Sequence, residues 1–195
     1  MKILLVRHGE TDWNRDGRIQ GWIDVGLNDE GRRQLEGLFP DLPDEPVDLF
    51  YSPLRRARES AEQLRPQLTC RRRRSIPQFR ELDQGYWDGL RGEWLAQQGD
   101  DRYRRWIDSP LATSPPGGES LQTVRERVRD GLVEVLEESK GPAVVVVHKV
   151  VINLIRHLAG ECPFPEVLEA LPANAEVLSI SVNLADVTGE PPANR

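Results

Sequence analysis

Cysteine is scarce in this sequence, and long apolar runs are missing. The two cysteines, Cys70 and Cys162, lie far apart and in no spacing typical of metal ligands, which excludes a disulfide-stapled scaffold or a zinc-finger type of domain. One disulfide between them stays open, but we expect two reduced thiols. No stretch approaches the roughly 18 apolar residues of a transmembrane helix, and the apolar run after Met1 is too short for a secretory signal. The sequence therefore predicts a cytoplasmic protein.

The charge balance is acidic, and its sign bears on the partners. There are 26 Lys and Arg against 32 Asp and Glu, a net charge of −6 at pH 7. This argues against nucleic acid or an anionic membrane as a partner. With 195 residues, 38% of them hydrophobic, the chain is long enough for one globular domain over 1–195. The segment at about 75–119 is rich in Trp and Gly, and we expect it to form an irregular lid or insertion.

Hydrophobic periodicity predicts an alternation of strands and helices. Short apolar runs indicate buried strands, and apolar residues at 3.6-residue spacing behind a capping residue indicate helices. The expected strands are 3–6, 47–51, 68–74, 143–147 and 177–184, and the expected helices begin at Asn28, Ser52, Ser120 and Lys149. This alternation predicts an α/β fold, a three-layer αβα arrangement with a mostly parallel sheet flanked by helices.

Two of the three histidines directly follow the two most apolar strand candidates. His8 comes after the first expected strand with Arg7 beside it, and His148 comes after the fourth. Ligands of open α/β sheets bind beyond the carboxyl ends of the strands, so Arg7 and His8 can face an anion together. The alternative is an ordinary surface turn in which Thr11 caps a helix.

Three further motifs carry polar residues that could bind phosphate, donate a proton or form a turn. The run 52–57, SPLRRA, opens a helix at a strand end, where Arg55 can bind phosphate oxygens through two N–H groups; the alternative is a solvated arginine pair. Glu81 lies beside aromatic residues, where a carboxyl group can serve as a general acid; the alternative is a loop salt bridge. The run 116–120, PGGES, predicts a tight turn into the long helix, a structural role.

Taken together, the motifs resemble a known family. RHGET at 7–11, SPLRRA at 52–57, ELDQGYWDG at 81–89, PGGES at 116–120 and VVVVH at 144–148 have the order and spacing of the histidine phosphatase superfamily, the phosphoglycerate mutase-like proteins. The resemblance covers about residues 2–184. It implies the phosphoglycerate mutase-like fold for a single histidine phosphatase domain, and it implies no metal and no cofactor.

The resemblance also implies a role for individual residues. His8 matches the nucleophile that becomes a phosphohistidine, and Glu81 matches the proton donor. The groups that hold the phosphoryl oxygens would be Arg7, Arg55 and His148. The substrate-binding residues would be Asn14, Gln20, Gly21, Thr11 and Lys149. Lys149 departs from the family pattern, which most often has glycine after its second histidine, so Lys149 puts the identity of the substrate in doubt but not the chemistry.

Three functions are consistent with this resemblance. The first is a metal-independent phosphomonoesterase, of the histidine acid phosphatase type, that acts on a small phosphorylated metabolite as a monomer or homodimer. The second is a cofactor-dependent phosphoglycerate mutase, which is favoured by the basic residues Arg102, Arg104 and Arg105. The third is a non-catalytic phosphate-binding relative. The phosphatase is favoured because the chain is short for a mutase and keeps every matched catalytic residue. The substrate stays open among sugar phosphates, phosphoglycerate, phosphoserine and a nucleotide-loop phosphate.

Overall fold

A five-stranded sheet organises the molecule, in a computed structural model that describes residues 1–98 and 101–189. The strands lie in the order β3-β2-β4-β1-β5. They are β1 (Lys2–Arg7), β2 (Val47–Tyr51), β3 (Cys70–Ser75), β4 (Ala143–Val147) and β5 (Val177–Ser181). β5 is antiparallel to β1, and all the other neighbours pair in parallel. The predicted mostly parallel sheet is confirmed.

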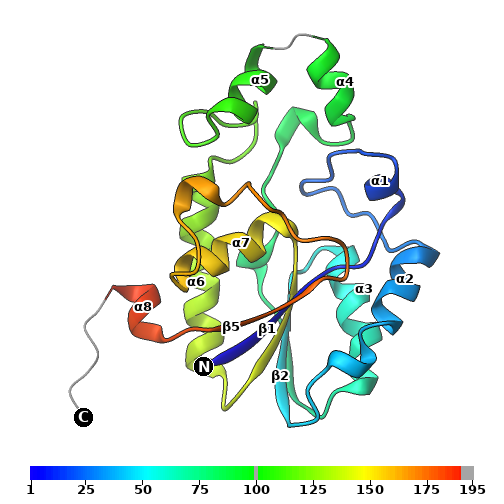
Figure 1. The fold of residues 1–195 in the computed structure, drawn as a ribbon, viewed down its shortest axis with the longest axis vertical. Coiled ribbons are helices and arrows are strands. Elements are labelled where there is room, and N and C mark those ends of the chain that lie inside the picture. The colour runs from blue at the N-terminus through cyan, green and yellow to red at the C-terminus, as the bar shows by residue number, and fades with distance from the viewer. Residues whose placement is uncertain (99–100, 190–195) are drawn as a thin grey trace.

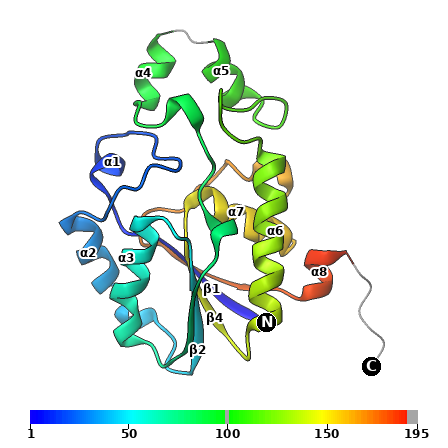
Figure 2. The ribbon, with the colours of Figure 1, turned by 180° about the vertical axis from the view of Figure 1, so that it is seen from behind.

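Helices cover both faces of this sheet (Figures 1 and 2). The described helices are α1 (Asp12–Arg15), α2 (Asp29–Glu36), α3 (Arg55–Leu64), α4 (Gly92–Gln97), α5 (Asp101–Asp108), α6 (Leu121–Glu138), α7 (Lys149–Leu158) and α8 (Leu184–Thr188). α2 and α3 share one apolar cluster with the sheet, and α6 and α7 share another. The three-layer α/β arrangement is therefore as predicted.

β4 shows how the sequence builds these layers. Successive side chains of a strand point to opposite faces, so Val144 and Val146 pack with α2 and α3 while Val145 and Val147 pack with α6 and α7. Because both faces are covered, a continuous run of valines is buried along the whole strand.

Three of the four predicted helix starts hold, including that of α7 at Lys149, and one does not. Asn28 and Ser120 cap α2 and α6 by accepting hydrogen bonds from the backbone amides of Gly31 and Thr123. Ser52 does not cap α3, which begins only at Arg55. The Ser52 hydroxyl instead accepts from the Leu54 amide and lies 2.7 Å from a ring nitrogen of His148.

The last predicted strand is too long. It ends at Ser181 rather than 184, and the chain then turns into α8. Asn183 and Asp186 form a capping box at the start of α8, because each side chain accepts a hydrogen bond from the backbone amide of the other residue.

The predicted insertion at 75–119 combines irregular loops with short helical elements. It contains α4, α5 and two 3-10 turns, Pro77–Phe79 and Gly85–Trp87. Figure 1 shows α4 and α5 as a lobe beyond the edge of the sheet at which β1 ends. Its action as a lid stays a prediction.

Two predictions from composition can be compared with the described residues. Cys70 and Cys162 are both free thiols, as expected. No described helix combines the length and the apolar character needed to cross a membrane.

Candidate active site

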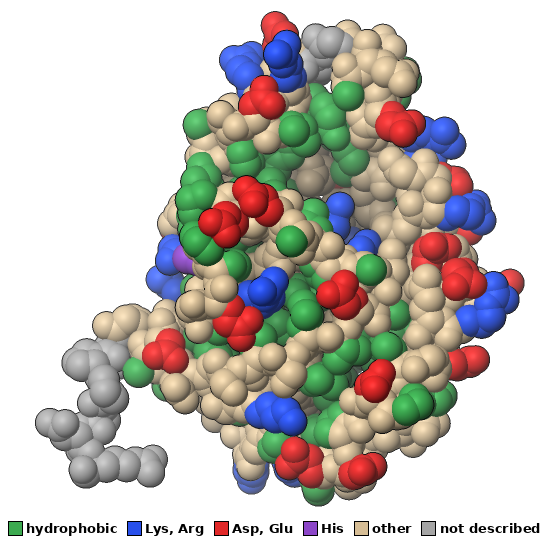
Figure 3. Space-filling model, in the orientation of Figure 1, with side chains coloured by type: hydrophobic (Ala, Val, Ile, Leu, Met, Phe, Trp, Pro, Cys, Tyr) green, Lys and Arg blue, Asp and Glu red, His purple; other side chains and the backbone are tan. Residues whose placement is uncertain are grey.

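A cavity opens at the carboxyl edge of the sheet. Its wall is built by the end of β1 and the loop after it, the start of α3, the segment around Glu81 and the start of α7. Figure 3 shows this face hollowed below the α4–α5 lobe, with Lys and Arg side chains inside the hollow. The predicted site residues that line the cavity are Arg7, His8, Asn14, Gln20, Gly21, Glu81 and Lys149.

His8 stands where β1 leaves the sheet. Its backbone amide donates to the carbonyl of Val147, which continues the β1–β4 pairing past the end of the strand. Its ring Nδ1 lies 2.8 Å from the Gly9 carbonyl; since a carbonyl only accepts, Nδ1 carries the proton and Nε2 keeps its lone pair. Burial lowers the pKa of His8 well below its usual range, and Arg56 and Arg7 lower it further. A neutral imidazole with a free Nε2 is a nucleophile.

Two buried guanidiniums lie at this histidine. Arg7 donates from Nη1 to the carbonyl of Pro172, and Arg56 donates to the carbonyls of Ile23 and Gly21. Among the described residues, the buried Nε of each guanidinium has no partner. Burial lowers the pKa of Arg56 to about 10, so Arg56 stays charged at neutral pH. Two cations with unused N–H donors suit a phosphoryl group.

The second arginine of the cavity is not the predicted one. The Arg55 side chain is 52% exposed and binds Glu59 through an ion pair of 2.6 Å on the outside of α3. One residue along a helix corresponds to a turn of about 100°, so the next side chain, Arg56, points into the cavity. The prediction that placed Arg55 in the site is wrong, and Arg56 takes that place. The point at which α3 starts decides between the two, and it places Arg56 with Ser60 on the buried face of the helix.

His148 lies beside His8 but does not line the cavity. The two ring centroids are 5.2 Å apart with the rings tilted by 60°, because β1 and β4 pair in parallel and end at the same edge. His148 is fully buried, its Nε2 is 2.7 Å from the Ser52 hydroxyl, and its Nδ1 has no partner in the described chain. Burial lowers the pKa of His148 well below its usual range. Its predicted contact with phosphoryl oxygens stays a prediction.

Glu81 is the acidic side chain of the cavity wall. It is 7% exposed, and its Oε1 accepts from the amide of Leu82 at 2.9 Å while Oε2 lies 3.5 Å from the amide of Val150. Lys149 reaches solvent in the cavity; the surrounding protein still lowers the pKa of its ammonium group, and the charge of Glu81 acts in the opposite sense. A carboxyl group and an ammonium group therefore share one wall with the two arginines.

Thr11 does not contact the cavity, contrary to the prediction. It is fully buried and caps α1, where its hydroxyl accepts from the Asn14 amide and donates to the Asn14 Oδ1. Asn174 also donates to Asn14 Oδ1, and to the carbonyl of His8. Thr11 and Asn174 thus orient Asn14 at the cavity.

Two other polar residues of the cavity, Arg18 and Gln84, were not predicted either. Both are polar loop residues next to predicted ones, Gln20 and Glu81, and only that neighbourhood in the sequence could have indicated them. Gly21, which was predicted, has a backbone reason to be glycine. Its φ is +44°, and a Cβ there would lie 2.0 Å from Oδ1 of Asp88.

Comparisons with known proteins decide the family. Residues 3–187 match the sequence profile of the histidine phosphatase superfamily, branch 1. This chain belongs to the histidine phosphatase superfamily. Among its relatives in this superfamily, phosphoserine phosphatase 1 of Hydrogenobacter thermophilus is 35% identical over 150 residues, which are 75% of this chain and 70% of that one. The metal-independent phosphoserine phosphatase of Arabidopsis thaliana is 34% identical over 149 residues, 75% of this chain and 63% of that protein.

Solved structures of the superfamily agree with the fold. The structure of a mycobacterial glucosyl-3-phosphoglycerate phosphatase superposes with a TM-score of 0.81 at 27% identity, covering 92% of each chain. The predicted superfamily, its α/β fold and phosphoric monoester hydrolysis are thereby confirmed. Such phosphatases act on small phosphorylated substrates.

Proposed function

We propose that this chain is a metal-independent phosphomonoesterase that works through a phosphohistidine at His8. The observation that supports this most is a neutral His8 with a free Nε2 in a cavity that also holds two buried arginines. The name of the Arabidopsis relative supports metal independence. In the described parts of the chain, no three His, Cys, Asp or Glu side chains cluster as metal ligands would.

The reaction follows from the charges and donors of the cavity. Arg7 and Arg56 bind the phosphoryl oxygens, and Nε2 of His8 attacks phosphorus while the ester P–O bond breaks. The imidazole then carries positive charge, which the Gly9 carbonyl stabilises through Nδ1–H. Glu81 gives its proton to the leaving oxygen. The Glu81 carboxylate then takes a proton from a water molecule, whose oxygen attacks the phosphohistidine and releases phosphate.

His148 and the remaining wall residues have supporting roles in this proposal. The His148 ring packs against the His8 ring and holds it in place. The contact of His148 with Ser52 connects both rings to the end of β2. Its own contact with the phosphoryl group, inherited from the family resemblance, is part of the proposal. Asn14, Gln20 and Gly21 contact the substrate.

The substrate we propose is a small phosphorylated metabolite with a second anionic group. A phosphate dianion would balance Arg7 and Arg56, and the cavity wall carries two more cations, Arg18 and Lys149, against the single carboxyl group of Glu81. The named substrates of the relatives, phosphoserine and glucosyl-3-phosphoglycerate, both carry a carboxylate. We further propose that the protein acts in the cytoplasm without nucleic acid or membrane partners, as a monomer or homodimer.

Hydrolysis of p-nitrophenyl phosphate in excess chelator tests the mechanism. The wild-type protein should stay active, and His8→Ala should reduce the rate to background because the nucleophile is gone. His157→Ala is the matched control, because His157 bonds Arg125 and the Cys162 carbonyl away from the cavity. Activity that persists in His8→Ala, or that chelator removes, contradicts the proposal. Release of phosphate from 3-phosphoglycerate without formation of the 2-isomer excludes the mutase.

A further inference from the structure

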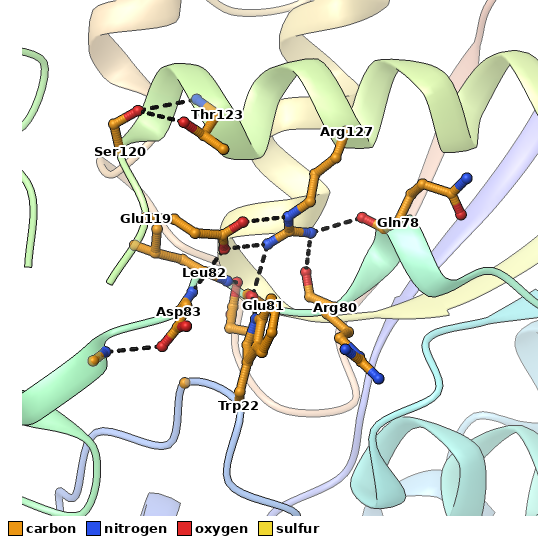
Figure 4. Close-up of polar contacts among 12 residues, drawn as sticks. Trp22, Gln78, Arg80, Glu81, Leu82, Asp83, Glu119, Ser120, Thr123 and Arg127 are labelled. Atoms are coloured by element: carbon orange, nitrogen blue, oxygen red, sulfur yellow. Dashed lines mark hydrogen bonds and ion pairs between the residues drawn. The ribbon is translucent and has the colours of Figure 1, made fainter. Parts of the chain in front are cut away.

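The guanidinium of Arg127, on α6, uses all five of its N–H donors (Figure 4). Two go to the carboxylate of Glu119, at 2.8 and 2.7 Å. The other three go to backbone carbonyls of the segment that leads to Glu81: Gln78 at 2.7 Å, Arg80 at 2.6 Å and Glu81 itself at 2.9 Å. The charged groups are largely buried, with 18% of the Arg127 side chain and 15% of the Glu119 side chain exposed.

Glu119 ties the same segment from the other side. Its Oε2 accepts from the amide of Asp83 at 3.0 Å, and its own amide donates to the carbonyl of Asp83. Gly118 permits this approach, since a Cβ there would lie 2.3 Å from the Asp83 carbonyl oxygen. The PGGES motif therefore brings a carboxylate against the backbone on the far side of Glu81.

One peptide group links this network to the carboxyl group of Glu81. The carbonyl of Glu81 accepts from Arg127 and, at 2.7 Å, from Nε1 of Trp22. The N–H of that same peptide group belongs to Leu82 and donates to Oε1 of Glu81. Because the peptide group is planar, fixing its oxygen also fixes the direction of its N–H. Two donors on the carbonyl also polarise the amide, which strengthens the N–H bond to the carboxyl group.

We propose that Arg127, oriented by Glu119, is a positioning residue for the proton donor: it sets the Glu81–Leu82 peptide plane that aims the Glu81 carboxyl group at the leaving oxygen. The inference rests on the proposed function. It assigns a role in catalysis to the PGGES motif, for which the sequence indicated only a turn. It also explains why an arginine is needed, since lysine has three donors on one nitrogen and cannot reach five acceptors in a plane.

The test uses two aryl phosphates of similar shape, p-nitrophenyl phosphate and phenyl phosphate. The p-nitrophenolate leaves without help, whereas phenolate needs a proton from the general acid. Arg127→Lys and Glu119→Gln should each lower kcat/KM for phenyl phosphate about 10-fold more than for p-nitrophenyl phosphate. Glu81→Gln should show the same selectivity more strongly. Arg129→Lys, an exposed residue of the same helix that pairs with Asp130, is the matched control and should change neither substrate.

A double variant separates positioning from a merely structural role. If Arg127 acts through Glu81, adding Arg127→Lys to Glu81→Gln should cause no further loss on phenyl phosphate. Equal losses on both substrates, or losses that add in the double variant, overturn the inference while leaving the His8 mechanism intact. If Glu81→Gln slows both substrates alike, the acid role and the inference fail together. Retained activity on p-nitrophenyl phosphate shows that each variant is folded, and Glu119→Gln decides the matter should Arg127→Lys not fold.

Discussion

Arg56 is the largest side chain that the described part of the chain buries completely. A buried guanidinium is destabilising unless its N–H groups find acceptors. The carbonyls of Gly21 and Ile23 accept from its two Nη atoms, whereas Nε has no acceptor among the described residues. A phosphate oxygen would supply that acceptor and the missing negative charge. Arg56 is therefore held ready for an anion before the anion arrives.

Removal of Arg56 should be costly to catalysis. Arg56→Ala should lower kcat/KM for p-nitrophenyl phosphate about 10- to 150-fold, which corresponds to the roughly 1.5–3 kcal/mol of a hydrogen bond to a charged group. Arg55→Ala is the neighbouring control and should stay within about threefold, because Arg55 only pairs with Glu59 at the surface. Steady-state kinetics and thermal unfolding of both variants check this. A loss of more than about threefold in kcat/KM for Arg55→Ala would show that Arg55 contributes to the site.

For single residues, the sequence predicts the position of side chains that directly follow a strand. It does not predict the position of side chains that are placed by contacts between distant segments. His8 and His148 follow buried strands directly, so their position depends on local pattern alone. The choice between Arg55 and Arg56 depends on where α3 starts, and one residue decides which side chain faces the cavity. Arg127 bonds residues more than 40 positions away, and no local pattern of the sequence contains that information.

At the scale of elements, α6 lies unusually close to the segment before Glu81. Arg127 and Gly131 are four residues apart and share one face of the helix. A Cβ on Gly131 would lie 2.9 Å from the Cβ of Gln78 and from the Phe79 ring. The absence of a side chain at Gly131 lets the helix approach, and this approach puts the Arg127 guanidinium within reach of three carbonyls.

Filling that contact should loosen both fold and site. Gly131→Val should reduce the free energy of unfolding by about 1–3 kcal/mol, as overpacking does in well-packed regions. Its exposed neighbour Asp130→Val should change it by no more than about 0.5 kcal/mol. Urea unfolding of the two variants gives both numbers. If Gly131→Val leaves the free energy of unfolding unchanged, the segment 76–79 moves away from α6 without destabilising the protein.

Other helix and strand ends could be predicted only where a capping residue is unambiguous. Asn28 and Ser120 stand before amphipathic runs and do cap α2 and α6. Ser52 looks the same in sequence, but its hydroxyl lies against His148, a residue 96 positions later. The capping box of Asn183 and Asp186 was present in the sequence, and it marks the true end of the last strand.

On the scale of the whole molecule, β3 is an edge strand of the sheet and carries a row of arginines. Arg72, Arg73 and Arg74 lie along this edge strand and pair with glutamates of α3 and α6. Charged side chains on an edge strand oppose pairing with another chain. The net charge of −6 thus coexists with two separate groups of arginines, one at an edge of the sheet and one inside the cavity.

The buried histidines should make the molecule sensitive to acid. His8 and His148 both have pKa values lowered by burial from 6.5, so below pH 6.5 the unfolded chain binds protons that the folded protein does not. The free energy of unfolding should therefore fall as the pH falls through 6.5, with a slope approaching about 1.4 kcal/mol per pH unit for each histidine. Asp88 acts oppositely, because burial raises its pKa to about 6.

Comparison of variants isolates the contribution of one histidine. Urea unfolding between pH 7 and pH 5 should give a shallower pH dependence for His148→Gln than for the wild type, because one of the two buried histidines that bind a proton on unfolding is gone. Equal slopes for His148→Gln and the wild type would show that folding does not lower the pKa of His148.

The pairing of β1 has a consequence for the order of events during synthesis. Ile3 pairs with Ala143 in β4 and with Ile180 in β5, so both partners of the first strand come late in the chain. Closing such distant contacts carries a high entropic cost and is slow. While a ribosome is still making the chain, β1 has nowhere to dock, although β2, α3 and β3 are already complete. His8, the proposed nucleophile, is thus translated well before the strands that fix its place, so phosphatase activity should appear only after β4 and β5 have paired with β1.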